Sequence, residues 1–175
     1  MRKSSELELA AVKDVAEFMA AAARTVPKTR GMDNIETIVI DIPAERDKLT
    51  QKMRELSKSL DKPSMARDAD SIKDSSQVLI IGVKSVPPGL SCDFCGHGTC
   101  TALVKSGGVC AFNSIDLGIA VGSAVSTAAD FRVDNRVMYS IGKAAMDLGL
   151  FSKDVKQALG MPLSVTGKSP FFDRK

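Results

Sequence analysis

The residues of this sequence that could do metal chemistry gather in one short stretch. All four cysteines lie between Cys92 and Cys110, in the order C-x2-C-x4-C-x9-C. A four-iron cluster takes one thiolate per iron, and Gly96 and Gly98 would let backbone N–H groups come close to the sulfurs. The spacing therefore predicts a 4Fe–4S cluster. The predicted ligands are Cys92, Cys95, Cys100 and Cys110.

A short helix is expected to begin inside this stretch. Thr99 is a suitable N-cap for a helix that starts at Cys100 and ends at the glycine pair 107–108. The positive end of that helix would then face an anionic cluster, which is electrostatically favourable. The two glycines would turn the chain back so that Cys110 reaches the same site.

Other interpretations of the cysteines remain open. Structural zinc also takes four thiolates, although its ligands commonly form two closely spaced pairs and only one C-x2-C pair is present. His97, the only histidine, could complete a zinc site, but a lone histidine in a glycine-rich loop is more often solvated. Cys92 and Cys95 could be a thioredoxin-like redox pair, which leaves the other two cysteines without a role. Chance clustering of four unrelated thiols is the least favoured interpretation.

Length and composition favour a globular protein with a substantial core. We expect a single domain over residues 1–175, with 91–110 as its cysteine-rich segment. The net charge of +3 is small and no basic face carries interleaved aromatics, so nucleic-acid binding is not expected. The longest apolar run is about nine residues, too short to span a membrane, and the N-terminus meets Glu6 and Glu8 before any apolar run, unlike a secretory signal. We therefore expect a cytoplasmic protein, in which clustered cysteines bind metal or do redox chemistry rather than form disulfides.

Apolar periodicity predicts the elements that must position this segment. Ser5-x-x-Glu8 is a capping-box pattern, and it opens a helix with Leu7 and Val15 on its apolar stripe that ends near Thr25. The other expected elements are a strand over 35–42, a helix from 43 to about 60, a loop with some helical turn over 61–77, a strand over 78–83, helices over 116–130 and 137–148, a short helix over 152–160 and a strand within 161–168. This mixture predicts an α+β fold.

At this point two resemblances to known families become visible. The segment CDFCGHGTCTALVKSGGVC resembles the four-cysteine iron–sulfur domain of corrinoid and electron-transfer proteins, although its fourth cysteine comes sooner here. Almost the whole chain is similar to a family of uncharacterised bacterial and archaeal proteins described as containing a ferredoxin domain. The segments that carry this second resemblance are AARTVPKTRGMDNIET, DLGIAVGSAVSTAAD and ALGMPLSVTGKSPFFD.

The order of the elements also resembles that of flavin nitroreductases. This resemblance implies a nitroreductase-like sheet flanked by helices, with the four-cysteine loop as an insertion. It also implies a homodimer that holds flavin mononucleotide (FMN) at its interface, and Lys28, Arg30 and Asn34 are the residues here that match that hypothetical flavin site. The Arg-Arg-Ser phosphate motif of nitroreductases is only Arg-Lys-Ser at positions 2–4 in this chain. The basic residues near position 28 could equally be an ordinary solvated loop.

The sequence therefore predicts an iron–sulfur protein that carries one 4Fe–4S cluster and works in electron transfer with a redox partner protein. One alternative is an oxidoreductase of nitroreductase type that depends on both FMN and a cluster. The other is a zinc-stabilised binding module. No residue is assigned a catalytic role, and neither a membrane nor a nucleic acid is expected as a partner.

Overall fold

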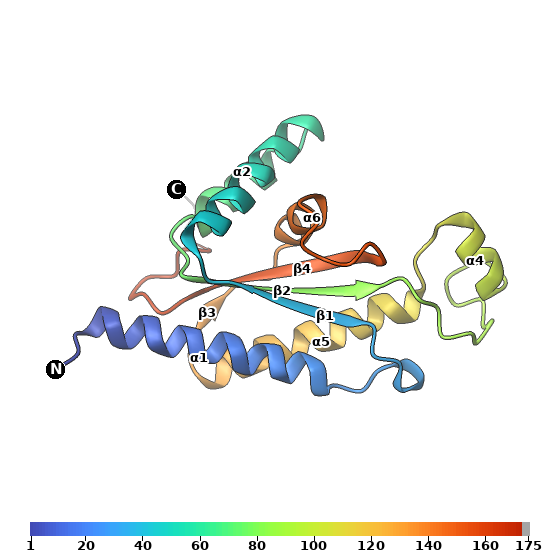
Figure 1. Ribbon diagram of the computed structural model, residues 1–175, viewed down its shortest axis with the longest axis horizontal. Helices are drawn as coiled ribbons and strands as arrows, with labels where there is room; N and C mark the ends of the chain where they lie inside the picture. Colours follow the sequence, from blue (N-terminus) through green and yellow to red (C-terminus); the bar gives the residue numbers. More distant parts are fainter. Residues whose placement is uncertain (173–175) are drawn as a thin grey trace.

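Four strands form one antiparallel sheet in the computed structural model, which describes residues 1–172 (Figure 1). The spatial order is β1-β2-β4-β3. The strands are β1 (Ile35–Ile40), β2 (Gln77–Lys84), β3 (Asp134–Asn135) and β4 (Val155–Ser164). The helices are α1 (Ser4–Thr25), the 3-10 turn η1 (Thr29–Gly31), α2 (Pro43–Ser59), α3 (Pro63–Ile72), α4 (Cys100–Ser106), α5 (Ala111–Asp130) and α6 (Tyr139–Asp147).

The sheet separates two hydrophobic layers. Helices α1 and α5 pack on one face, and α2, α3 and α6 pack on the other (Figure 1). Strand β2 lies between β1 and β4, and because side chains alternate along a strand, Leu79 and Ile81 point to the first layer while Val78 and Ile80 point to the second. This burial on both faces explains why β2 reads as a continuous apolar run rather than an alternating one.

Helix α6 packs unusually close to strand β4. A Cβ atom built on Gly142 would lie 1.8 Å from the carbonyl oxygen of Ala158, and one built on Gly160 would lie 2.1 Å from Ile141. Both positions therefore require glycine. Strand β3 pairs with β4 only at Leu163 and Ser164, and Met138, just before α6, adds one isolated bridge to β4 at Gly160.

Most of the predicted elements are confirmed. The strands at 35 and 78 and the helices that begin near residues 5, 43, 100, 116 and 137 are all present, in a nitroreductase-like α+β fold. The first helix differs in detail, because it begins at Ser4 and the carboxylate of Glu6 accepts from the Lys3 N–H at 3.0 Å, so the predicted capping box is wrong. Its buried stripe includes Val12 and Val15, and Leu7 is exposed.

Two other predictions are wrong. Residues 61–77 are not mainly a loop, because Pro63 begins helix α3, which buries Met65, Ala69 and other residues against α2. Residues 152–160 are not a helix, because β4 begins at Val155 and continues to Ser164. The expected strand within 161–168 is therefore only the second half of a ten-residue strand.

Ser152, predicted as a helix cap, instead binds the carboxylate of Glu36 on β1. Its Oγ donates to Glu36 Oε1 at 2.5 Å, and Lys84 Nζ lies 3.2 Å from the same oxygen. Burial favours the neutral form of Glu36, but the hydrogen bonds from Ser152 and Lys84 outweigh this effect and lower the pKa of Glu36 below its ordinary value. The contact ties the start of β4 to the edge strand of the sheet.

No single helix within residues 1–172 is long and apolar enough to cross a membrane. Helices α4 and α5 reach such a length only when taken together, and they are bent by 84° at the break between them.

Candidate metal centre

The cysteine segment projects from one end of the sheet, beyond the two hydrophobic layers (Figure 1). The chain leaves β2 at Lys84, runs through residues 85–99 without regular secondary structure, forms α4, and returns to the core at the first turn of α5. Prolines 87 and 88 keep the first part of this connection out of the sheet, because proline cannot donate to a strand ladder. The whole cysteine segment therefore lies outside the main core, attached at two points.

All four cysteines line one narrow cavity in this segment. Cys110 is buried at the N-cap of α5, Cys95 and Cys100 are partly buried, and Cys92 is exposed. The free space in this cavity is about 10 Å³. Within residues 1–172, no three His, Cys, Asp or Glu side chains converge as the ligands of a single metal ion would.

Backbone amides point at one of the thiols. The N–H of Ser91 donates to Cys100 Sγ at 3.3 Å. This hydrogen bond is the main reason why the pKa of Cys100 lies below that of an ordinary thiol; partial desolvation opposes the shift, and N–H groups of Gly89 and Leu90 support it. A thiolate stabilised in this way is the form that binds metal.

The conformation of this loop depends on positive φ angles, which few residue types adopt. Asp93 has φ +58°, and its carboxylate accepts from the N–H of Gly98 at 2.5 Å, while its carbonyl accepts from Gly96 at 2.9 Å. Gly96 and Gly98 have φ values of +75° and +72°, which are unstrained only for glycine. The predicted role of these glycines is therefore conformational as well as steric.

Helix α4 begins where the sequence predicts. The N–H of Ala102 donates to Thr99 Oγ1 at 3.2 Å, and Gly107 ends the helix at φ +70°. His97 does not line the cysteine cavity; its Nδ1 lies 3.3 Å from Ser106 Oγ, and its ring packs against Gly108. The single histidine thus lies beside α4, away from the four thiols.

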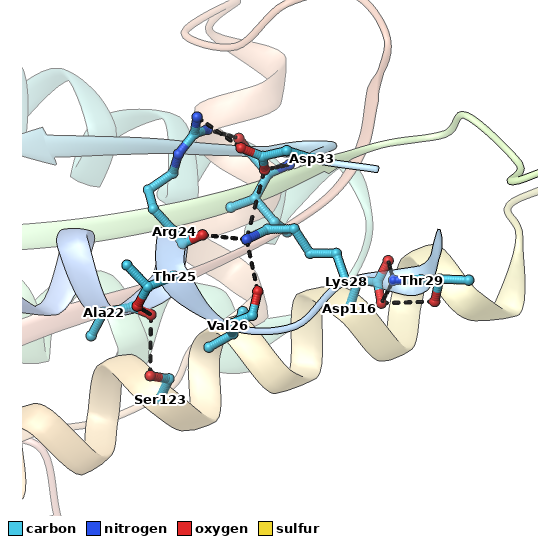
Figure 2. A network of polar contacts seen from close by, with 10 residues as sticks. Ala22, Arg24, Thr25, Val26, Lys28, Thr29, Asp33, Asp116 and Ser123 are labelled. Atoms are coloured by element: carbon cyan, nitrogen blue, oxygen red, sulfur yellow. Dashed lines mark hydrogen bonds and ion pairs between the residues drawn. The ribbon is translucent and has the colours of Figure 1, made fainter. Parts of the chain in front are cut away.

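The hypothetical flavin residues all have protein partners. Lys28 is 6% exposed, and its ammonium donates to the carbonyls of Arg24 and Val26, with Asp33 Oδ1 at 3.9 Å (Figure 2). It therefore closes the C-terminus of α1, where unpaired carbonyls attract a cation.

The other two flavin candidates contact the chain that leads into the cysteine segment. Arg30 Nη1 donates to the carbonyl of Pro88 at 2.8 Å, and Asn34 Nδ2 donates to that of Val86 at 3.4 Å. Pro88 itself lines the cysteine cavity. The loop at 28–34 and the cysteine segment are therefore in direct contact, which the sequence analysis did not foresee.

A buried carboxylate fixes this loop from the opposite side. Asp116 on α5 is 3% exposed, and it accepts from the Thr29 N–H at 3.1 and 3.2 Å and from the Thr29 hydroxyl at 3.0 Å (Figure 2). The signal in the sequence is a single acidic residue within the apolar run SIDLGIAVG, but its partner lies 87 positions away. Asp116 thus positions η1, and with it Arg30.

A second, larger cavity of about 450 Å³ also escaped the sequence analysis. It lies between the first half of α5, helix α6, the start of β4 and the turn that joins α2 to α3. Its lining residues are Leu60, Lys62, Ser114, Leu117, Gly118, Tyr139, Lys143, Met146, Lys156, Gln157, Ala158 and Leu159. These residues come from four elements, so no local pattern brings them together.

The fold is nitroreductase-like. It resembles a nitroreductase with bound FMN from Desulfitobacterium hafniense, with a TM-score of 0.62, 12% identity, and coverage of 96% of this chain and 80% of that one. It also resembles a BluB-like flavoprotein from Clostridium difficile, with a TM-score of 0.61, 15% identity, and coverage of 93% and 82%. At this level of identity the likeness defines the fold alone.

The chain belongs to the family described as "Uncharacterized protein containing a ferredoxin domain", whose pattern matches residues 106–174. A relative from Archaeoglobus fulgidus, described as an uncharacterized protein, is 44% identical over 172 residues, which cover 93% of this chain and 91% of the relative. The match to residues 106–174 includes Cys110 and α5, whereas the relative extends the similarity to nearly the whole chain.

Proposed function

We propose that this protein is an electron-transfer protein that binds one 4Fe–4S cluster through Cys92, Cys95, Cys100 and Cys110. The observation that carries the proposal is the cavity lined by all four thiols. The family's ferredoxin domain supports the same conclusion. When bound, such a cluster supplies one-electron chemistry.

The residues of the segment would have distinct tasks toward the cluster. The Ser91 N–H would hydrogen-bond to a ligand sulfur, which is one of the means by which proteins set the reduction potential of such a centre. Phe94 and Phe112 line the cavity with ring centroids 5.4 Å apart, and they would limit the access of water. Arg30 would hold the Pro88 side of the cavity in place and add a positive charge near an anionic group.

The direct test is metal analysis of protein purified without oxygen. We expect about four irons and four sulfides per chain. Changing Cys92, Cys95, Cys100 or Cys110 to Ser should each strongly lower the iron content, because a serine oxygen is a poor match for iron–sulfide chemistry. One zinc with no labile sulfide would contradict the proposal and favour the zinc-stabilised binding module.

The same analysis checks the ligand assignment. His97→Ala is the matched control, because His97 lies in the same loop but outside the cavity, and its iron content should be unchanged. Full iron occupancy in Cys110→Ser would mean that the fourth ligand is a different residue.

An oxidoreductase that uses both FMN and the cluster is the second candidate, and the fold shared with an FMN-containing nitroreductase favours it. Lys28, Arg30 and Asn34 remain its proposed flavin residues, and each would have to exchange its present partner for the ligand. The test is titration of cluster-loaded protein with FMN. Binding that weakens about tenfold in Arg30→Ala, or about 1.4 kcal/mol, would support this candidate. No detectable binding at hundreds of micromolar FMN would contradict this candidate and favour the simple electron carrier.

We also propose that the protein forms a homodimer and exchanges electrons with a partner protein. The nitroreductase-like fold supports the dimer, as does the outer face of α5, where Ile115 and Ile119 are about 40% exposed beside Gly118 and Gly122. Light scattering at micromolar concentration should give twice the chain mass. A mass equal to that of one chain would refute the proposed dimer. It would also refute the argument for a flavin site at a dimer interface.

A further inference from the structure

The 450 Å³ cavity has an apolar floor and a cationic rim. Its floor includes Leu117 on α5 and Leu159 on β4, both on the side toward the core. Three lysines stand around it, one from each of three elements: Lys62, Lys143 and Lys156. The volume is in the range of small-molecule sites, which also combine apolar walls with a few polar groups.

The polar groups of the cavity are not equally free to bind a ligand. Ser114 Oγ donates to Gln157 Oε1 at 2.7 Å, so the serine proton and the glutamine oxygen are already paired. Lys143 pairs with Asp147 at 3.0 Å on the exposed side of α6. Lys62 lies 5.8 Å from the ring centroid of Tyr139, and Lys156 has no ion-pair partner within residues 1–172.

This balance indicates the chemistry of the ligand. Lys62 and Lys156, which have no carboxylate partner within residues 1–172, attract a negative charge attached to an apolar body. A flavin ring offers a row of alternating donors and acceptors, and two of the side chains that could match it, Ser114 and Gln157, are hydrogen-bonded to each other. A small aromatic or aliphatic carboxylate or phosphate therefore fits the cavity better than a flavin.

The cavity also lies beside the cysteine site. Phe112 on the first turn of α5 lines the cysteine cavity, and Ser114 and Leu117 on the next turns line the lysine-rimmed cavity. With a rise of about 1.5 Å per residue, Cys110 and Ser114 are separated by about 6 Å along the helix axis. Figure 1 shows that β4 and α5 both begin at the end of the sheet from which the cysteine segment projects.

We propose that the lysine-rimmed cavity is the binding site of a small organic anion, with an apolar body and a single carboxylate or phosphate group. The binding site stands on its own geometry. That the anion is a substrate of an electron-transfer protein rests on the proposed function.

The test uses 2-naphthoate, 2-naphthyl phosphate and the neutral 2-naphthamide as fluorescent probes of the full-length protein, both metal-free and cluster-loaded. We expect one or both anions to bind about tenfold more tightly than the amide, because only the anions engage the ammonium groups. The two anions distinguish a carboxylate site from a phosphate site. Lys62→Met or Lys156→Met should weaken anion binding several-fold, and Lys13→Met on α1, far from the cavity, should not.

A second variant blocks the cavity without removing charge. Gly118 lies on the cavity wall in an exposed part of α5, and a Cβ atom there would meet nothing within 4 Å, so Gly118→Leu should fold normally. It should abolish anion binding. Equal affinity for acid and amide, undiminished binding in Gly118→Leu, or displacement of the anions by micromolar FMN would overturn the proposal.

The outcomes also separate this inference from the proposed function. Anion binding by a protein that takes up no iron would keep the site and refute the electron-transfer proposal. A protein with full iron content that binds neither anion would refute the site alone.

Discussion

Replacing Asp116 by Asn should loosen the loop that leads from α1 to β1. The two carboxylate oxygens of Asp116 accept three hydrogen bonds from Thr29, at 3.0 to 3.2 Å, and the side chain is almost fully buried. An asparagine of the same shape keeps one acceptor but turns an NH2 group toward the donors of Thr29, and water cannot replace the lost partner. Hydrogen bonds to charged groups are worth about 1.5–3 kcal/mol, so we expect Asp116→Asn to lower the free energy of unfolding by about 2 kcal/mol.

The assay is thermal unfolding of the metal-free protein followed by circular dichroism, so that metal binding does not add to stability. For a chain of this size, about 2 kcal/mol corresponds to a fall in Tm of roughly 4–8 °C. A double-mutant cycle with Thr29→Ala isolates the hydroxyl contact, and we expect a coupling energy near 1 kcal/mol. If Asp116→Asn is as stable as the wild type, or if the two changes add within about 0.5 kcal/mol, the contact does not position the loop.

Three other changes test the arrangement of the elements and the loop. Gly142→Ala should destabilise the protein by about 1–3 kcal/mol, because its Cβ would overlap a β4 carbonyl oxygen at 1.8 Å, whereas Gly118→Ala on α5 should be neutral or stabilising in the same denaturant titration. Arg30→Gln should accelerate loss of iron to a chelator, since Pro88 on the cavity wall loses its charged hydrogen bond; an unchanged rate would show that this contact is unimportant. Glu36→Gln should be less stable than the wild type above pH 4.5, and because the folded pKa of Glu36 is lowered, the difference should shrink as the pH falls through that pKa. A difference that is constant from pH 7 to pH 3 would contradict the ionised contact.

The elements that the sequence predicts well are those whose burial follows from local periodicity. Strand β2 is a run of β-branched and apolar residues buried on both faces, and α5 repeats small and apolar residues at helical spacing. The prediction fails at strand β4 for the opposite reason. Its sequence, VKQALGMPLS, contains glycine and proline and few β-branched residues. Its extended form is imposed by pairing with β2 and by the approach of α6, and neither is a local property.

The candidate site divides in the same way. The cysteine positions and the Thr99 cap are local, and the structure gathers all four thiols around one cavity as the spacing predicts. The contact of Arg30 with Pro88 joins positions 58 residues apart. From the sequence alone, Arg30 could therefore be identified only as part of a basic loop. The predicted flavin role of Lys28 came from resemblance to a family, and no pattern in the sequence could have revealed that its ammonium is enclosed by backbone carbonyls.

The attachment of the cysteine segment at the end of the sheet has a consequence for the maturation of the protein in the cell. Neither hydrophobic cluster contains a cysteine, so the two packed layers do not depend on metal for their apolar contacts. In this respect the protein differs from small zinc domains, which are unfolded without their ion. The newly made chain should therefore reach its compact state first and then act as a ready acceptor for a cluster delivered by the assembly machinery. Damage by oxygen to the proposed cluster would leave a repairable polypeptide rather than an unfolded one marked for degradation.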